Sequence, residues 1–229
     1  TTLFEALLQR LVAAGPAALP EQVLRACRHL PAALRLKLVE RLLPDGEAQR
    51  LASLLEAQAA SYWLSLLRDL PALEVAQGRQ PRAEALAEFV EVLVDRILKA
   101  DVAPGASEGT SATLSQALPT TMWVAAYLAV SDTGHCLCPG VISERLGSLA
   151  EQVLKRLDPL WPQLTPREVE EIFRANGDCA AEVSRRALRQ LGRVIDVRTQ
   201  IVILHAAARV PGTSDAALAD GYGAVQRRI

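Results

Sequence analysis

The chain has 229 residues, of which 50% are apolar and only 4% aromatic, and its 25 basic and 26 acidic side chains leave a formal net charge of −1. This composition excludes wholesale disorder, and its reliance on leucine and alanine favours helices over strands. The near-zero charge excludes a global basic field that would hold the protein on nucleic acid or on an anionic membrane, so such contacts must come from local patches.

Neither a membrane span nor a secretory signal is visible in the sequence. The longest apolar runs, such as "MWVAAYLAV" at 122–130, are far shorter than the roughly 20 residues that cross a bilayer. The 4 cysteines are too sparse for a disulfide scaffold, and Cys27 lies in an apolar run where a small buried side chain is expected. We therefore expect no membrane insertion and a reducing intracellular compartment: cytosol, nucleus or mitochondrial matrix.

In the N-terminal part, apolar residues recur every three or four positions and predict a series of helices. The expected helices cover 2–14, 20–30, 32–43, 46–70 with a possible break near Ala60, and 81–101. Proline cannot lie inside a helix without losing a hydrogen bond, so Pro16, Pro31 and Pro44 separate the early ones. The segment 81–101 has the clearest apolar stripe, with charged residues on its other face.

The segment "DVAPGASEGTSA" at 101–112 has no stripe and is rich in Gly, Ser and Pro, which is typical of a loop. It divides the chain into N-terminal hairpins at 1–101, a linker at 102–112 and C-terminal hairpins at 113–229, unless the whole forms one continuous domain. The helices expected after it cover 113–131 with a restart at Pro119, 142–157, 165–177, 179–192, 195–210 and 214–226.

The segment 165–177 carries the most complete boundary signals. Thr165 and Glu168 have the spacing of a capping box, Pro166 suits the first helical position, and Gly177 suits the C-terminal end. Its apolar face, like that of the other segments, is too large to be covered within one helical hairpin, so neighbouring hairpins must cover it.

The sequence therefore predicts an all-α fold of about ten short helices stacked as antiparallel hairpins, either an α-solenoid or an irregular helical bundle. With no fixed repeat period, the pattern resembles irregular α-solenoid proteins of the HEAT kind. The segment "LTPREVEEIFRA" at 164–175 also resembles the first helix of the hairpin repeats in organellar RNA-associated proteins. These resemblances imply a surface that binds macromolecules.

The stretch "TGHCLCPG" at 133–140 is the one cluster of soft side chains. A structural zinc site needs four ligands, usually in two pairs, and no second pair accompanies Cys136 and Cys138. We interpret the stretch as a loop, with metal binding or redox chemistry as alternatives. His205 stands in an apolar helix without an orienting carboxylate, and no catalytic or nucleotide-binding motif is present. We expect no catalytic, cofactor or metal residues, and hence no enzyme.

Five arginines form the main candidate contact surface. Arg185, Arg189 and Arg193 are spaced four apart, and Arg186 and Arg198 stand nearby. Three interpretations stay open: a solvated helix face that pairs with Glu168, Glu171 or Glu182, a surface for an acidic protein partner, or a surface for RNA phosphates.

Trp63 and Trp123 lie in the apolar stretches "SYWLSLL" and "TTMWVAAYLAV" and are either core residues or interface contacts. With the arginines they complete the candidate partner-binding set. The function we expect is a non-enzymatic scaffold or adaptor subunit of a larger assembly, which works by protein–protein recognition. The alternative is an RNA-associated helical-repeat protein of an organellar ribonucleoprotein, such as a component of the mitochondrial ribosome.

Overall fold

The computed structural model describes most of the chain from residue 57 onward and parts of the chain before it. The described residues are 9, 27, 29–42, 55, 57–102, 119–136, 141–175 and 180–227, and side chains at 57–58, 101–102, 135–136 and 141–143 are not described. Every regular element within these residues is a helix, and none of them forms a strand. The prediction of an all-α fold is confirmed.

The helices of the N-terminal part are α3 (Ala32–Leu42), α5 (Ala57–Leu67), α6 (Leu70–Ala76) and α7 (Gln80–Val102). The C-terminal part contains α8 (Thr120–Cys136), α9 (Val141–Leu157), the 3₁₀ helix η2 (Asp158–Gln163), α10 (Pro166–Arg174), α11 (Ala180–Gln190), the 3₁₀ helix η4 (Leu191–Arg193), α12 (Val197–Ala208) and α13 (Asp215–Gln226). These bounds match seven predicted segments to within a few residues: 32–43, 81–101, 142–157, 165–177, 179–192, 195–210 and 214–226.

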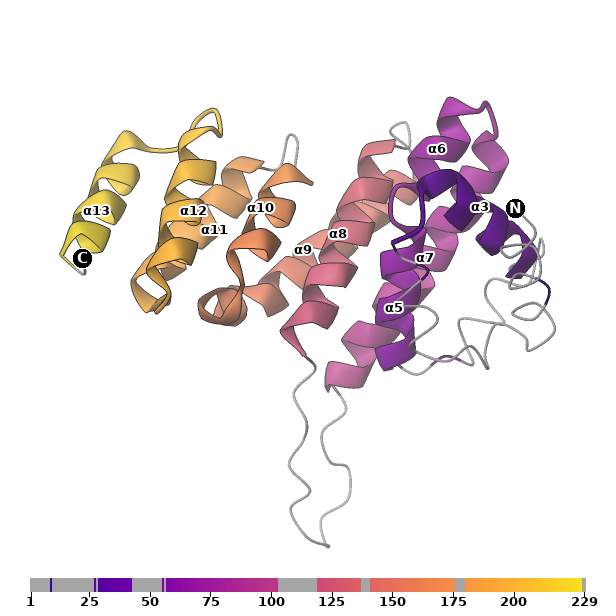
Figure 1. The fold of residues 1–229 in the computed structure, drawn as a ribbon, viewed down its shortest axis with the longest axis horizontal. Helices are drawn as coiled ribbons and strands as arrows, with labels where there is room; N and C mark the ends of the chain where they lie inside the picture. The colour runs from indigo at the N-terminus through magenta and orange to yellow at the C-terminus, as the bar shows by residue number, and fades with distance from the viewer. Residues whose placement is uncertain are drawn as a thin grey trace, which may run out of the picture.

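The C-terminal helices pair in sequence order and stack in two layers (Figure 1). The pairs are α8 with α9, α10 with α11, and α12 with α13. Helices α8, α10 and α12 contact one another in succession and form one layer, while η2, α11 and α13 follow one another in the second layer. The array is open, with α3 near one end and α13 at the other (Figure 1). Stacked hairpins of this kind leave grooves between successive helices of a layer.

A continuous core of leucine, valine and alanine runs through the array. The stripe predicted in 81–101 is buried along its length, and Phe89 on that stripe meets the Trp63 ring edge-on with ring centres 5.9 Å apart. Trp161 in η2 makes a similar edge contact with Phe173 of α10, at 6.4 Å. Cys27 is buried, as its apolar neighbours indicated.

The chain breaks between α5 and α6 at Arg68 and Asp69, so the prediction of one helix to residue 70 with a break near Ala60 is wrong. Pro71 lies in the first turn of α6, and Asp69 takes a left-handed backbone conformation (φ 66°) that ends the preceding helix. The Arg35 guanidinium of α3 donates to the carbonyls of Leu66 (3.0 Å) and Arg68 (2.7 Å), which would otherwise lack partners.

The N-terminal boundary signals of α10 are confirmed. The Thr165 hydroxyl accepts from the Glu168 amide (3.3 Å), and the Glu168 carboxylate accepts from the Thr165 amide (2.8 Å). Gly177 lies outside the described residues, as do most of the linker predicted at 102–112 and most of the helices predicted at 2–14 and 20–30. The prediction that 133–140 is a loop is wrong for residues 133–136, because α8 continues to Cys136.

Candidate functional site

The five arginines predicted to form one surface are distributed over different environments. Arg186 turns inward and is only 12% exposed. Its guanidinium contacts Glu151 of α9 (2.6 Å), Asp158 of η2 (2.7 Å) and Glu182 of α11 (2.8 Å). Three elements are thereby joined through one cation, and Arg186 is not available to a partner.

The electrostatics of this cluster favour the charged forms of its members. Burial on its own lowers the pKa of Arg186, but the hydrogen bond to Glu182 and the charges of Asp158 and Glu151 outweigh it and raise that pKa. The hydrogen bond from Arg186, together with nearby arginine charges, lowers the pKa of Glu182. Both shifts favour the charged forms of Arg186 and Glu182, and the contacts of Arg186 join α9, η2 and α11.

The other four arginines are exposed. Arg185 forms an ion pair with Glu182 at 2.5 Å on its own helix, and Arg193 donates to the Gln190 side chain at 3.3 Å. Arg189 makes no ion pair with any other described residue. Arg198 lies in the first turn of α12. The pairing with Glu182 that the sequence left open is therefore present, but only at Arg185 and Arg186.

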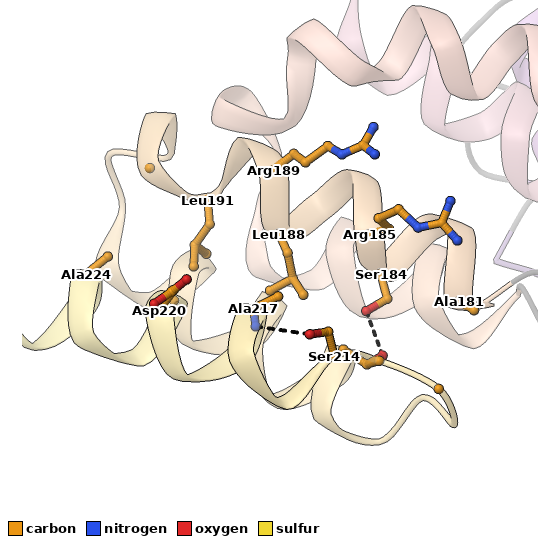
Figure 2. Close-up of a pocket in the computed structure, with 14 residues that line it drawn as sticks. Ala181, Ser184, Arg185, Leu188, Arg189, Leu191, Ser214, Ala217, Asp220 and Ala224 are labelled. Atoms are coloured by element: carbon orange, nitrogen blue, oxygen red, sulfur yellow. Dashed lines mark hydrogen bonds between the residues drawn. The ribbon is translucent and has the colours of Figure 1, made fainter.

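Arg185 and Arg189 border a cavity between α11 and α13, which we call the α11–α13 groove (Figure 2). Its volume is about 470 Å³. Leu188 and Leu191 supply apolar surface on the α11 side, and small residues supply it on α13: Ala217, Gly221 and Ala224. The lining also includes Arg185, Arg189, Ser184, Thr213, Ser214 and Asp220.

Gly221 allows α13 to approach the array closely. A Cβ atom at this position would lie 2.6 Å from Cδ2 of Leu204 and 2.9 Å from Cδ2 of Leu191. A larger residue would force the buried side chains of Leu204 and Leu191, or α13 itself, to shift. The position of α13, and with it the width of the groove, depends on this glycine.

The charged groups lie on opposite walls of the groove. Figure 2 shows Arg185 and Arg189 projecting from α11 away from α13, whereas Asp220 belongs to α13. Hydroxyl groups occupy one end: Ser184 and Thr213 share a hydrogen bond of 3.0 Å, and the Ser214 hydroxyl accepts from the Ala217 amide. An apolar floor between a cationic wall and an acidic residue is suited to recognition of an amphipathic surface.

Two further cavities open on the layer formed by α8, α10 and α12. One, of about 470 Å³, lies between α8 and α10, where Arg68 pairs with Asp132 (2.7 Å) and Glu171 (3.2 Å), so its charges compensate one another. The other, of about 550 Å³, lies between α10 and α12. There His205 is exposed, with Nε2 3.4 Å from a guanidinium nitrogen of Arg209.

Trp63 and Trp123 are both in the core, at 0% and 3% exposure. Their apolar surface therefore packs within the protein, and they contribute nothing to the exposed surface. Among the described residues, the exposed large apolar side chains are instead Ile195, Ile201 and Tyr222, at 85%, 49% and 47%. The sequence analysis did not single them out, because spacing along one helix does not show which apolar side chains a neighbouring helix covers.

The "TGHCLCPG" stretch is only partly described. Residues 137–140 and Cys179 lie outside the described residues, as do the side chains of His135 and Cys136. Among the side chains that are described, no three His, Cys, Asp or Glu residues gather in a way that could hold a metal ion. No described helix combines the length and the apolar character needed to span a membrane.

The α11–α13 groove is thus the candidate site that the fold and the predicted arginines have in common. Comparison of the chain with protein-family models, with curated proteins and with solved structures finds no match in any of the three.

Proposed function

We propose that this protein is a non-enzymatic scaffold or adaptor that recognises a partner protein through the α11–α13 groove. The observation that carries the proposal is the groove itself, an open apolar channel with Arg185 and Arg189 on its rim. Binding there makes and breaks no covalent bond. The partner's apolar side chains would be removed from water where they pack on Leu188, which is half-buried, and burial of apolar surface favours association.

The carboxylates around the arginines favour a protein over RNA as the partner. Glu151, Asp158 and Glu182 surround Arg186, and Glu182 also pairs with Arg185. Phosphate binding depends on cations that are free to replace the counterions of the nucleic acid. Two of the five arginines are already compensated, which weakens this surface as a site for RNA.

One observation supports RNA association as the second candidate. Arg189, Arg193 and Arg198 are exposed, and none of them lies at ion-pair distance from a carboxylate of the described residues. RNA binding measured at several salt concentrations tests this candidate, with Arg189, Arg193 and Arg198 changed to Glu together. A salt dependence that becomes shallower in the variant supports RNA association.

Site-specific photocrosslinking in the cells that make the protein tests the proposal. A photoreactive phenylalanine at Ala181 or Ala224 reports on the groove, and the same residue at Ala208, exposed on α12, is the control. We expect one protein to crosslink from both groove positions and not from Ala208. Ala217→Trp, which fills the groove, should abolish those crosslinks without altering the helical circular dichroism spectrum.

Other outcomes of this experiment count against the proposal. Crosslinks to RNA from the groove positions would favour the second candidate. Crosslinks that are equally strong from Ala208, or that persist in Ala217→Trp, would show that the groove is not the recognition surface.

A further inference from the structure

The geometry of the α11–α13 groove points to one kind of occupant, and this inference rests on the proposed function. We propose that the groove binds an amphipathic helix of a partner protein, with acidic side chains on the flank that faces α11. The apolar ridge of that helix would lie on the groove floor, and its other flank would be neutral or basic.

The shape of the groove favours a helix. Ala217, Gly221 and Ala224 follow one another at intervals of four and three, so they share one face of α13. Gly221 is buried against Leu204 and Leu191, whereas the short side chains of Ala217 and Ala224 are half-exposed and leave room for a partner helix to approach. Side chains at helical spacing on a partner form a ridge that packs into such a groove.

An extended peptide has less to bind to here. Peptides in the extended conformation gain affinity by pairing with the edge of a sheet, and the described part of the chain contains no strand. The groove volume of about 470 Å³ holds a few anchoring side chains and not a whole helix. The occupant should therefore lie along the surface and insert its apolar ridge.

The charges set the orientation of the occupant. On the α11 wall the Arg189 guanidinium has no ion pair with a described residue, and Arg185 shares its charge with Glu182. On the α13 wall the only charged lining residue is Asp220. Residues 180–227 contain seven arginines but four carboxylates, in a chain whose net charge is −1. An acidic flank beside α11 complements this distribution.

Selection from a displayed peptide library tests the inference with the full chain as target. The library presents amphipathic helices of about four turns, with leucine fixed along one ridge and every other position randomised. We expect the selected peptides to carry Asp or Glu along one flank and to bind the purified protein in solution. Ala217→Trp should abolish this binding, and Ala224→Trp fills the same groove if the first variant does not fold.

Charge reversal then tests the orientation. Arg189→Glu should weaken the selected peptides about three- to tenfold, and changing the acidic flank of the peptide to Lys should restore binding to this variant. Arg41→Glu, the same change on an exposed residue of α3, is the matched control and should leave affinity unchanged. Asp220→Lys should change which residues are selected on the peptide flank that faces α13, and leave the acidic flank unchanged.

Three results would overturn the inference: no enrichment of helical peptides, selected peptides without an acidic flank, or equal effects of Arg189→Glu and Arg41→Glu. The proposed function fails differently. The proposed function is wrong if the groove positions crosslink to no protein in cells. If they crosslink to a protein through a neutral or basic segment, only the inference of an acidic helix is wrong.

Discussion

Arg186 offers the sharpest test of the structure, because the sequence makes it look equivalent to Arg189. Both are arginines of α11 spaced three apart, yet Arg186 is buried among three carboxylates and Arg189 is exposed. Replacing Arg186 with Met keeps much of the apolar stem and removes the charge. Glu151, Asp158 and Glu182 would then face one another without their shared cation.

The cost can be worked out from the exposure of the carboxylates. Removing one partner of a fully buried ion pair costs about 3–5 kcal/mol. Here the three carboxylates are 30% to 42% exposed, so water can hydrate them once the guanidinium is gone. We therefore expect Arg186→Met to lower the free energy of unfolding by about 2 kcal/mol, which corresponds to a decrease in Tm of roughly 4–8 °C for a chain of this size.

Urea denaturation followed by far-ultraviolet circular dichroism measures this loss. Arg189→Met is the matched control and should stay within about 0.5 kcal/mol of wild type. Combining Arg186→Met with Glu182→Gln should cost less than the two single changes added, because the second removes a carboxylate that the first leaves unpaired. Equal stability of the Arg186 and Arg189 variants would refute the inward position of Arg186.

Three further predictions concern the packing, the capping and the pH dependence of the fold. Gly221→Ala should destabilise the protein by about 1–3 kcal/mol in urea denaturation, because its Cβ would meet Leu204 and Leu191, whereas Gly223→Ala has space on the same helix and should stabilise it by about 0.5–1 kcal/mol. Thr165→Ala removes the N-terminal cap of α10 and should cost about 1 kcal/mol, while Thr165→Ser should restore most of the loss; equal costs would contradict the capping box. The lowered pKa of Glu182 adds stability above its unfolded pKa of about 4.3, and this stability is lost as pH falls through the lower folded value, so acid denaturation of Glu182→Gln should have a shallower pH dependence. Burial raises the pKa of Glu74, so Glu74→Gln should make the acid loss of stability steeper, opposite to Glu182→Gln. If both variants change the pH dependence of stability in the same direction, this reasoning is wrong.

The sequence predicted helix boundaries best where a short local motif determines the backbone. The capping box of Thr165 and Glu168 acts within a single turn, so its spacing alone located the start of α10. The break between α5 and α6 depends on Arg35, which lies more than thirty residues away and donates to the carbonyls at the end of α5. Such a tertiary contact has no local signal in the sequence.

The candidate site was less accessible to sequence reasoning than the fold. Helical spacing placed Arg185 and Arg189 together on α11, and the structure brings both to one groove. Spacing could not show that Arg186 turns inward, because its partners Glu151 and Asp158 are 35 and 28 positions away on other elements. The small residues of α13 were missed as well, since alanine and glycine carry no chemical signal until a neighbouring helix is in place.

The inward and outward arginines of α11 have different roles around the groove that we propose as a binding site. The Arg186 cluster holds α11 against α9 and η2, so the wall that carries Arg189 is fixed before any partner arrives. Gly221 similarly fixes α13 against α12 and η4 by allowing close contact with Leu204 and Leu191. Because both walls of the groove are held in place without an occupant, little free energy of binding is lost to ordering the protein. Loosening either wall should therefore weaken partner binding even where the lining residues are unchanged, which links the stability of the fold to recognition in the α11–α13 groove.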